Sequence, residues 1–232
     1  MRPRYPAAMV DDLLAGQRLQ VLDVGCGTGI AAEAFVARGC QVHGVEPDSR
    51  MAAVAERKGI TVDVSAFEEW AAGGREFDLV ISGQAWHWVD PEVGLVKAAS
   101  VLRPGGRLAT FWNLARHDPE TQAALDQVYG RHAPALVKGS LAVGRAGADP
   151  GGDEPGVRSS GLFDDPQVRK YSWTQQHTTA EWIGQLPTHS DHRLLEPRVL
   201  SALLHDLADL IDERGGQIVL LYETLLVTAT RR

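Results

Sequence analysis

Three glycines at alternate positions, Gly25, Gly27 and Gly29, follow directly on the apolar run 21–24, and no other feature constrains the fold as much. Glycine adopts positive φ and has no Cβ, so a turn built from it lets a ligand approach the backbone closely. The pattern predicts a strand that bends sharply into a helix, whose first N–H groups face a ligand. In the dinucleotide fingerprint G-x-G-x-x-G the third glycine would stand at Ile30, one residue later.

Segments of strand and helix type alternate along the first half of the chain. This alternation predicts a parallel sheet covered by helices on both faces. The helix ends carry their usual signals, because Asp90 precedes Pro91 at one start and Gly39 and Gly59 follow two ends. The expected strands are 19–24, 41–46, 61–64, 77–82 and 107–112, and the expected helices are 29–38, 48–58, 67–72 and 91–102.

The pattern changes after Trp112. The stretch 138–161 holds seven of the 24 glycines, and its composition predicts a mobile loop without secondary structure. Around it we expect helices at 119–130, 179–186 and 197–213 and strands at 168–176 and 217–229, the last two forming an antiparallel pair at the sheet edge. The chain of 232 residues is expected to form one domain, with a partial cover at 1–18, a core at 19–112, a cap at 113–196 and a closing helix and strand at 197–232.

Charge and cysteine content limit the class of partner. The formal net charge is −7 and no basic run is longer than Arg231 and Arg232, which argues against a protein that neutralises nucleic-acid phosphates. Cys26 and Cys40 do not suggest a disulfide framework, and no run reaches the roughly 20 apolar residues of a membrane span. We therefore expect a cytoplasmic protein, monomer or homodimer, with a small-molecule partner and with neither nucleic acid nor membrane.

Four motifs together resemble the class I S-adenosylmethionine-dependent methyltransferases, specifically the small-molecule branch similar to trans-aconitate methyltransferase. They are VLDVGCGTG (21–29), GVEPDSRM (44–51), SGQAWHWVDP (82–91) and LRPGGRL (102–108), and the likeness covers nearly the whole chain. It implies an α/β fold: a Rossmann-like seven-stranded sheet, parallel with one antiparallel strand near an edge, flanked by helices, with a small cap after strand five. It also implies S-adenosyl-L-methionine as cofactor, S-adenosyl-L-homocysteine as product and a small-molecule methyl acceptor.

The resemblance gives roles to residues at the carboxyl ends of the strands. Asp23 is expected to face the methionine ammonium of the cofactor, and Glu46 to accept hydrogen bonds from both ribose hydroxyls. Met51 is expected either against the adenine or in the core, and Ser65 stands where many relatives place an acid. The expected cofactor-binding residues are Asp23, Gly25, Cys26, Gly27, Gly29, Glu46, Pro47, Met51, Ser65, Ala66, Phe67, Ser82, Gln84 and Arg2.

The segment after strand four is expected to face the methyl group. His87 is the candidate general base, because imidazole titrates near neutral pH, although in the family this histidine often only shapes the pocket. The neighbouring tryptophans either wall the site or pack beneath the cap. A solvated loop is the simpler interpretation of His192, and His43, His132, His177 and His205 lack metal-ligand spacing, so no metal is expected. The expected substrate-binding residues are Trp86, Trp88, Trp112, Asn113 and His189.

Residues 2–6, Arg-Pro-Arg-Tyr-Pro, match a piece that similar proteins carry after an additional helix folded over the cofactor. Arg2 is expected to pair with the methionine carboxylate of the cofactor, and Tyr5 to cover it. Because Met1 directly precedes this segment, we expect either that the true start lies upstream or that part of the helical cover over the cofactor is missing.

Two other function classes stay open on the sequence. A non-catalytic protein that binds S-adenosylmethionine or S-adenosylhomocysteine would keep the same cofactor residues and differ only in transferring no methyl group. An NAD-dependent oxidoreductase has the same kind of α/β fold but needs a glycine where Ile30 stands. The chain also lacks the Asn/Asp-Pro-Pro-Tyr/Phe run of the exocyclic-amine nucleic-acid methyltransferases.

Overall fold

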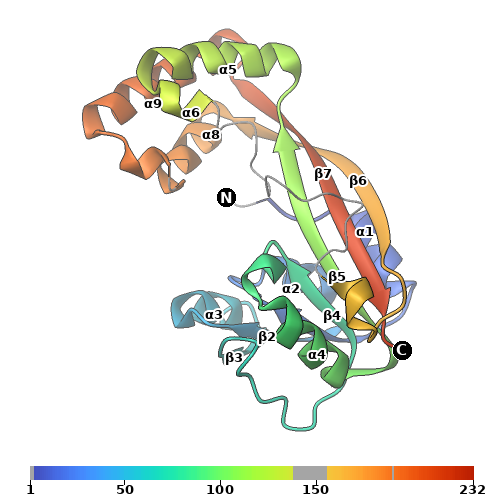
Figure 1. The fold of residues 1–232 in the computed structure, drawn as a ribbon. Coiled ribbons are helices and arrows are strands. Elements are labelled where there is room, and N and C mark those ends of the chain that lie inside the picture. Colours follow the sequence, from blue (N-terminus) through green and yellow to red (C-terminus); the bar gives the residue numbers. More distant parts are fainter. Residues whose placement is uncertain (1–2, 138–155, 190) are drawn as a thin grey trace. The chain divides into compact units, whose positions relative to one another are not determined.

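The computed structural model describes residues 3–137, 156–189 and 191–232. Within these residues a seven-stranded sheet has the order β3-β2-β1-β4-β5-β7-β6, and β7 runs opposite to β5 (Figure 1). The predicted sheet, parallel at its centre and antiparallel toward one edge, is confirmed. The strands are β1 Gln20–Val24, β2 Gln41–Glu46, β3 Thr61–Val64, β4 Phe77–Gly83, β5 Leu102–Arg116, β6 Gln167–Thr178 and β7 Gln217–Thr230.

Several helices begin at a residue whose side chain caps the first turn. Asp90 accepts hydrogen bonds from the backbone N–H groups of Glu92 and Val93 at the start of α4, and Asp118 does the same at the start of α5. The α-helices are α1 Ala7–Leu14, α2 Ile30–Val36, α3 Ser49–Glu56, α4 Pro91–Val101, α5 Pro119–His132, α6 Pro134–Val137, α7 Val157–Ser160, α8 Thr179–Gln185 and α9 Pro197–Glu213, and the 3₁₀ turns are η1 Trp86–Trp88, η2 Leu186–Thr188 and η3 His192–Leu194.

Two local predictions are wrong. The expected helix at 67–72 is a single turn, because the chain bends at Gly73 and Gly74, which both have positive φ. The stretch expected to lack secondary structure contains α7, held because Val157 is buried in the core. The rest of that glycine-rich stretch, 138–155, lies outside the described residues.

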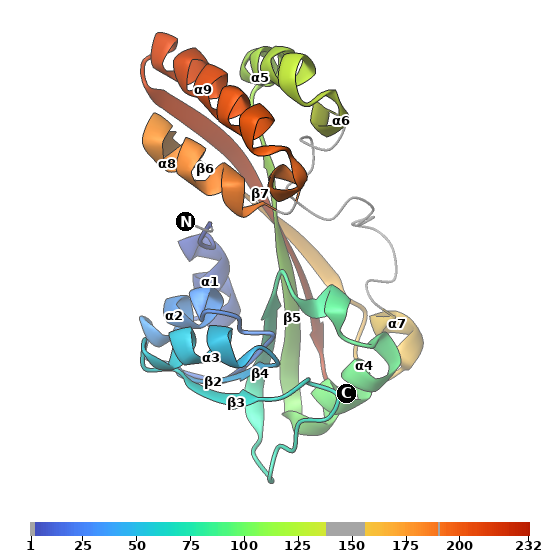
Figure 2. The same ribbon diagram turned by 90° about the vertical axis from the view of Figure 1, so that its left-hand side faces the viewer.

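Alternate side chains of the central strands pack on opposite faces of the sheet. Leu22 of β1 and Val80 of β4 lie in one apolar cluster with residues of α4 and α7, and Val21 and Leu79 lie in another with residues of α1 and α2. Ala52 and Ala55 of α3 pack in a smaller cluster with residues of α2 and β3. Figure 2 shows α1, α2 and α3 on the side of the sheet away from α4 and α7.

Two compact units divide the chain. The sheet unit comprises residues 4–113, 147–171 and 224–232, and the helical unit comprises 1–3, 114–146 and 172–223, so that β5, β6 and β7 each contribute to both. The helical unit has its own core, in which Leu203, Leu207 and Ile211 of α9 pack with residues of α5 and α8. Among the described helices, none is both long and apolar enough to cross a membrane.

Candidate cofactor-binding site

The glycine turn joins β1 to α2 and has positive φ at all three glycines: 67° at Gly25, 56° at Gly27 and 78° at Gly29. A Cβ at Gly29 would lie 2.4 Å from Cδ1 of Ile60 and 3.2 Å from Cβ of Ala55, so a side chain there requires both neighbours to shift. A Cβ at Gly27 would meet no atom within 4 Å among the described residues. Gly27 therefore presents bare backbone to open space, as a ligand cradle requires.

Asp23 lies in β1, two residues before Gly25, and is 1% exposed. Neither carboxylate oxygen has a hydrogen-bond partner at normal distance among the described residues. Burial raises the pKa of Asp23 to about 8; the nearby Glu46 carboxylate adds to this rise, and the backbone amide of Ala32 opposes it. A buried acceptor without a donor is costly, so this carboxylate is suited to receive a cation or a strong donor.

Glu46 at the end of β2 is 3% exposed and holds the glycine turn. Its Oε2 accepts a hydrogen bond from the backbone N–H of Gly27 at 2.9 Å, and its Oε1 accepts one from the N–H of Asp48 at 3.0 Å. A carboxylate has about four acceptor sites, so two remain for other donors. β1 pairs with β2 and β2 with β3 in parallel register, which brings Asp23, Glu46 and Ser65 to the same edge of the sheet.

The residues expected around the adenine lie at the same edge. Met51 is half-buried in the first turn of α3, and Pro47 is exposed. Ser65 donates its hydroxyl to the carbonyl of Ala66 at 2.9 Å, and Phe67 is buried against Trp70 and Trp86.

Cys26 contributes backbone rather than side chain to the turn. Its N–H donates to the carbonyl of Val45 at 3.2 Å, while its thiol is buried among the apolar residues of α2 and α3. That burial raises the pKa of the thiol well above its usual range. Gly44 makes room for it, because a Cβ at Gly44 would lie 2.6 Å from the sulfur.

Gln84, one of the predicted cofactor-binding residues, directly follows β4 and has a strained backbone that the sequence did not predict. Gln84 has φ of +59°, which is unusual outside glycine, and its backbone N–H donates to the carbonyl of Phe111. Its side-chain amide donates to the carbonyl of Asn113 at 3.2 Å. Ser82 is fully buried and donates its hydroxyl to the carbonyl of Val24, joining β4 to β1 beside the site. Strain of this kind is typical of functional sites.

The first described residues are tied to the end of β5. The amide nitrogen of Asn113 donates to the carbonyl of Arg4 at 3.0 Å, and its amide oxygen accepts from the hydroxyl of Thr224 at 2.6 Å. Tyr5 packs edge-on against Phe111, with ring centroids 4.6 Å apart. Asn113, expected at the acceptor, thus uses one end of its amide to hold the segment that contains Tyr5 and the other end to join β5 to β7. Arg2 lies outside the described residues.

The aromatic residues after β4 and β5 fall into two groups. Trp86 and Trp112 are each 1% exposed and belong to the core of the sheet unit, and neither indole N–H has a partner among the described residues. Trp88 is 82% exposed and lies beside the exposed His87, with ring centroids 4.9 Å apart. Among these residues, only His87 and Trp88 present their rings to solvent.

His189 belongs to the helical unit, as does His192. His192 is 5% exposed, so the interpretation of this residue as part of a solvated loop is wrong. Its Nε2 lies 2.9 Å from the hydroxyl of Tyr129 and its Nδ1 lies 2.8 Å from Oδ1 of Asp191. The sequence carried no signal for this network, because Tyr129 and His192 are 63 residues apart.

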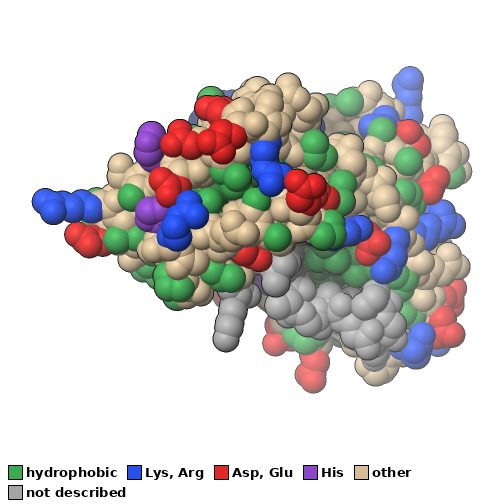
Figure 3. All heavy atoms as spheres, turned by 90° about the horizontal axis from the view of Figure 1, so that it is seen from above, with side chains coloured by type: hydrophobic (Ala, Val, Ile, Leu, Met, Phe, Trp, Pro, Cys, Tyr) green, Lys and Arg blue, Asp and Glu red, His purple; other side chains and the backbone are tan. Residues whose placement is uncertain are grey.

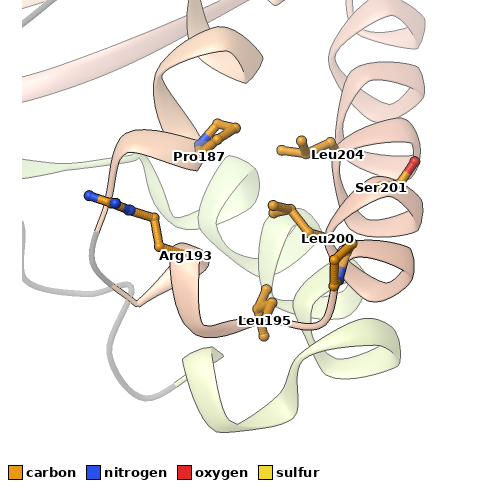
Figure 4. A pocket seen from close by; sticks show the side chains of 7 residues that line it. Pro187, Arg193, Leu195, Leu200, Ser201 and Leu204 are labelled. Atoms are coloured by element: carbon orange, nitrogen blue, oxygen red, sulfur yellow. The ribbon is translucent and has the colours of Figure 1, made fainter.

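The helical unit also contains a shallow hollow of about 450 Å³. Figure 4 shows Leu200 and Leu204 of α9 facing Pro187, with the Arg193 side chain extending away from them. The walls are thus mainly apolar and come from η2, η3 and α9. The residues that line it are Pro187, Arg193, Leu195, Pro197, Leu200, Ser201 and Leu204.

Residues 22–110 match a protein-family model described as a methyltransferase domain. The match spans the glycine turn, Glu46 and the end of β4, which are the elements that build the site described above. Residues 22–110 therefore resemble a methyltransferase domain.

Known relatives agree with this class. An uncharacterised methyltransferase of Mycobacterium tuberculosis is 38% identical over 133 residues, which are 56% of this chain and 54% of the relative. A Saccharomyces cerevisiae protein named as a probable S-adenosylmethionine-dependent methyltransferase is 32% identical over 124 residues, 48% of this chain and 42% of the relative. This chain thus spans about half the length of the curated relatives it matches.

A solved structure of a candidate type II methyltransferase from Anaeromyxobacter dehalogenans resembles the whole chain. It has a TM-score of 0.71 at 24% identity and covers 100% of this chain and 98% of its own. At this identity the likeness shows that the two proteins share a fold.

Proposed function

We propose that this protein transfers the methyl group of S-adenosylmethionine to an oxygen, nitrogen or carbon atom of a small-molecule acceptor. The observation that carries the proposal is the cradle formed by Asp23, Gly27 and Glu46. The Asp23 carboxylate is buried with no donor at normal distance among the described residues, Gly27 presents bare backbone, and Glu46 has acceptor sites left for other donors. All three lie at one edge of the sheet. In this order, these groups match the methionine ammonium, the methionine side chain and the ribose hydroxyls of the cofactor.

Each residue of the cradle has a distinct role in this proposal. S-adenosylmethionine supplies a methyl group on a positively charged sulfur, which is displaced in line by the acceptor atom. Asp23 pairs with the ammonium and Glu46 accepts the ribose hydroxyls. Ser65, Ala66 and Phe67 border the adenine, with Pro47 and Met51 on the α3 side. Holding the donor in one orientation supplies much of the catalysis, because alignment lowers the entropic part of the barrier.

His87 is the proposed general base, since its imidazole is exposed in η1 at the end of β4. Trp88 is proposed to contact the acceptor, and Trp86, Trp112 and Asn113 of the same unit to shape its surroundings. Turnover that is unchanged in His87→Ala, with intact cofactor affinity, would remove the histidine from the chemistry.

The surface favours a small acceptor over nucleic acid. The face in Figure 3 shows acidic, basic and apolar side chains interspersed, with no continuous field of Lys and Arg among the described residues. The formal net charge of −7 agrees with this distribution. We propose that the protein acts as a monomer or homodimer in the cytoplasm.

Calorimetry with S-adenosylhomocysteine tests the donor. We expect one site per chain and an affinity about 10- to 100-fold weaker in Glu46→Gln, because a charged acceptor is lost. Glu56→Gln, an exposed carboxylate at the end of α3, is the matched control and is expected to bind as the natural chain does. Urea unfolding of both variants separates lost binding from lost folding.

Absence of binding by either S-adenosylmethionine or its product would overturn the proposal. Release of S-adenosylhomocysteine in the presence of hydroxyl, amine and carbon-acid metabolites then identifies the acceptor class. Binding of the cofactor with no transfer to any class would favour the non-catalytic alternative.

A further inference from the structure

The loop between η2 and η3 gathers three metal-ligating side chains. His189, Asp191 and His192 each offer one ligand atom, and these atoms all lie within 4.8 Å of one another. The rings of the two histidines meet edge to face with centroids 5.7 Å apart. All three residues belong to the helical unit, so the cluster is separate from the residues of the cofactor cradle.

His192 is held as a metal-binding histidine usually is. It is buried, with one ring nitrogen 2.9 Å from the Tyr129 hydroxyl and the other 2.8 Å from the Asp191 carboxylate. In metal sites the nitrogen away from the metal is commonly fixed by such an outer partner. Tyr129 is itself buried in the core of the helical unit, so the imidazole is oriented by a rigid element.

We propose that His189, Asp191 and His192 bind a first-row divalent cation, of which zinc is the reference case. Two imidazoles and one carboxylate form a recurrent ligand set for zinc and for non-haem iron, and they leave at least one position open. The cation takes the lone pair of His192 Nδ1, the ring proton is then carried on Nε2, and Nε2–H donates to the Tyr129 oxygen.

The geometry needs only a local adjustment. Ligands about 2.1 Å from a tetrahedral metal lie about 3.4 Å apart. Oδ1 of Asp191 and Nδ1 of His192 lie 2.8 Å apart, which is a hydrogen-bond distance, so a cation displaces the proton between them and moves the two atoms slightly apart. His189 is half-buried and its ring contacts that of His192, so the remaining adjustment lies within the cluster itself. The prediction that no metal binds was based on the spacing of four other histidines. It did not consider His189, Asp191 and His192 together.

Cobalt(II) is a suitable probe, because its visible absorption reports ligand type and geometry. Untagged, chelator-treated protein is titrated with cobalt and then with zinc as competitor. We expect one cation per chain with the intense bands of a four- or five-coordinate site, and loss of at least tenfold in affinity in His189→Ala and in Asp191→Asn. Tyr129→Phe, which leaves all three ligands, is expected to weaken binding about tenfold through loss of the outer partner.

His205→Ala is the matched control. His205 is exposed on α9 and lies 3.5 Å from Asp209, so it is another His–Asp pair, and no third ligand joins it among the residues that the structure describes. Its removal is expected to change neither stoichiometry nor spectrum. Absence of stoichiometric binding, or equal affinity in the natural chain and in His189→Ala and Asp191→Asn, would overturn the proposal. Because the readout is metal binding, its failure leaves the proposed methyl transfer untouched.

Discussion

Single residues carry the strongest functional information in this molecule. A carboxylate such as Asp23, buried at the end of β1 with no donor at normal distance among the described residues, lowers the stability of the free protein unless it stays protonated. Its pKa of about 8 means that the neutral form dominates at pH 7. A cationic ligand would reverse this balance, so proton release and cofactor binding should be coupled.

Calorimetry can measure that coupling. With S-adenosylhomocysteine at pH 7, in two buffers of different ionisation enthalpy, we expect proton release on binding and an affinity that rises between about pH 6 and 8. In the free protein the same group lowers stability as the pH rises from about 4 toward 8, because the folded state binds a proton there that the unfolded chain has lost.

Asp23→Asn should abolish the release and weaken binding about 10- to 100-fold, since a hydrogen bond to a charged group is lost. Glu56→Gln serves again as the control and should leave the release unchanged. Equal proton release in Asp23→Asn and the natural chain would assign the proton to another group.

The helices and strands around a residue decide how well a substitution at that residue is tolerated. Within the β1–α2 turn, Gly29 is packed against α3 and Gly27 faces open space, although both have positive φ. The single turn within 67–72, which follows β3, also depends on the residues packed around it. The Asp63 carboxylate accepts from the Trp70 indole at 2.7 Å and from Arg75 at 2.8 Å, contacts that hold the chain in one turn where its sequence predicts a helix.

Alanine at the two glycines should separate folding from binding. We expect Gly29→Ala to reduce the free energy of unfolding by about 2 to 4 kcal/mol, the sum of left-handed strain and overpacking. Gly27→Ala should cost only about 1 to 2 kcal/mol from strain, yet weaken S-adenosylhomocysteine binding at least tenfold, because its Cβ enters the space of the cofactor.

Urea unfolding and calorimetry on both variants check this pair. Gly59→Ala is the matched control, with φ of +82° and open space around its Cβ but a place outside the turn. The interpretation of Gly27 fails if its variant binds as tightly as Gly59→Ala.

At the scale of the whole molecule, the features that the sequence predicted are local, and the features that it did not predict depend on long-range contacts. The alternation of strands and helices, the capping acids and the glycine spacing are local, so they predicted the sheet, most element bounds and the class of cofactor. The division into a sheet unit and a helical unit, through which β5, β6 and β7 all pass, was not predicted. It depends on contacts between residues far apart in the chain.

The sequence by itself determined the parallel core of the sheet and the glycine turn after β1, because periodicity and glycine spacing act over a few residues. Only the tertiary structure decided which polar groups are buried and with what partners. It left Asp23 with no donor at normal distance among the described residues, used Asn113 as a tether, exposed Trp88, and joined His192 to a tyrosine 63 positions away. Burial and hydrogen-bond pairing arise only when distant segments pack, so no local pattern encodes them.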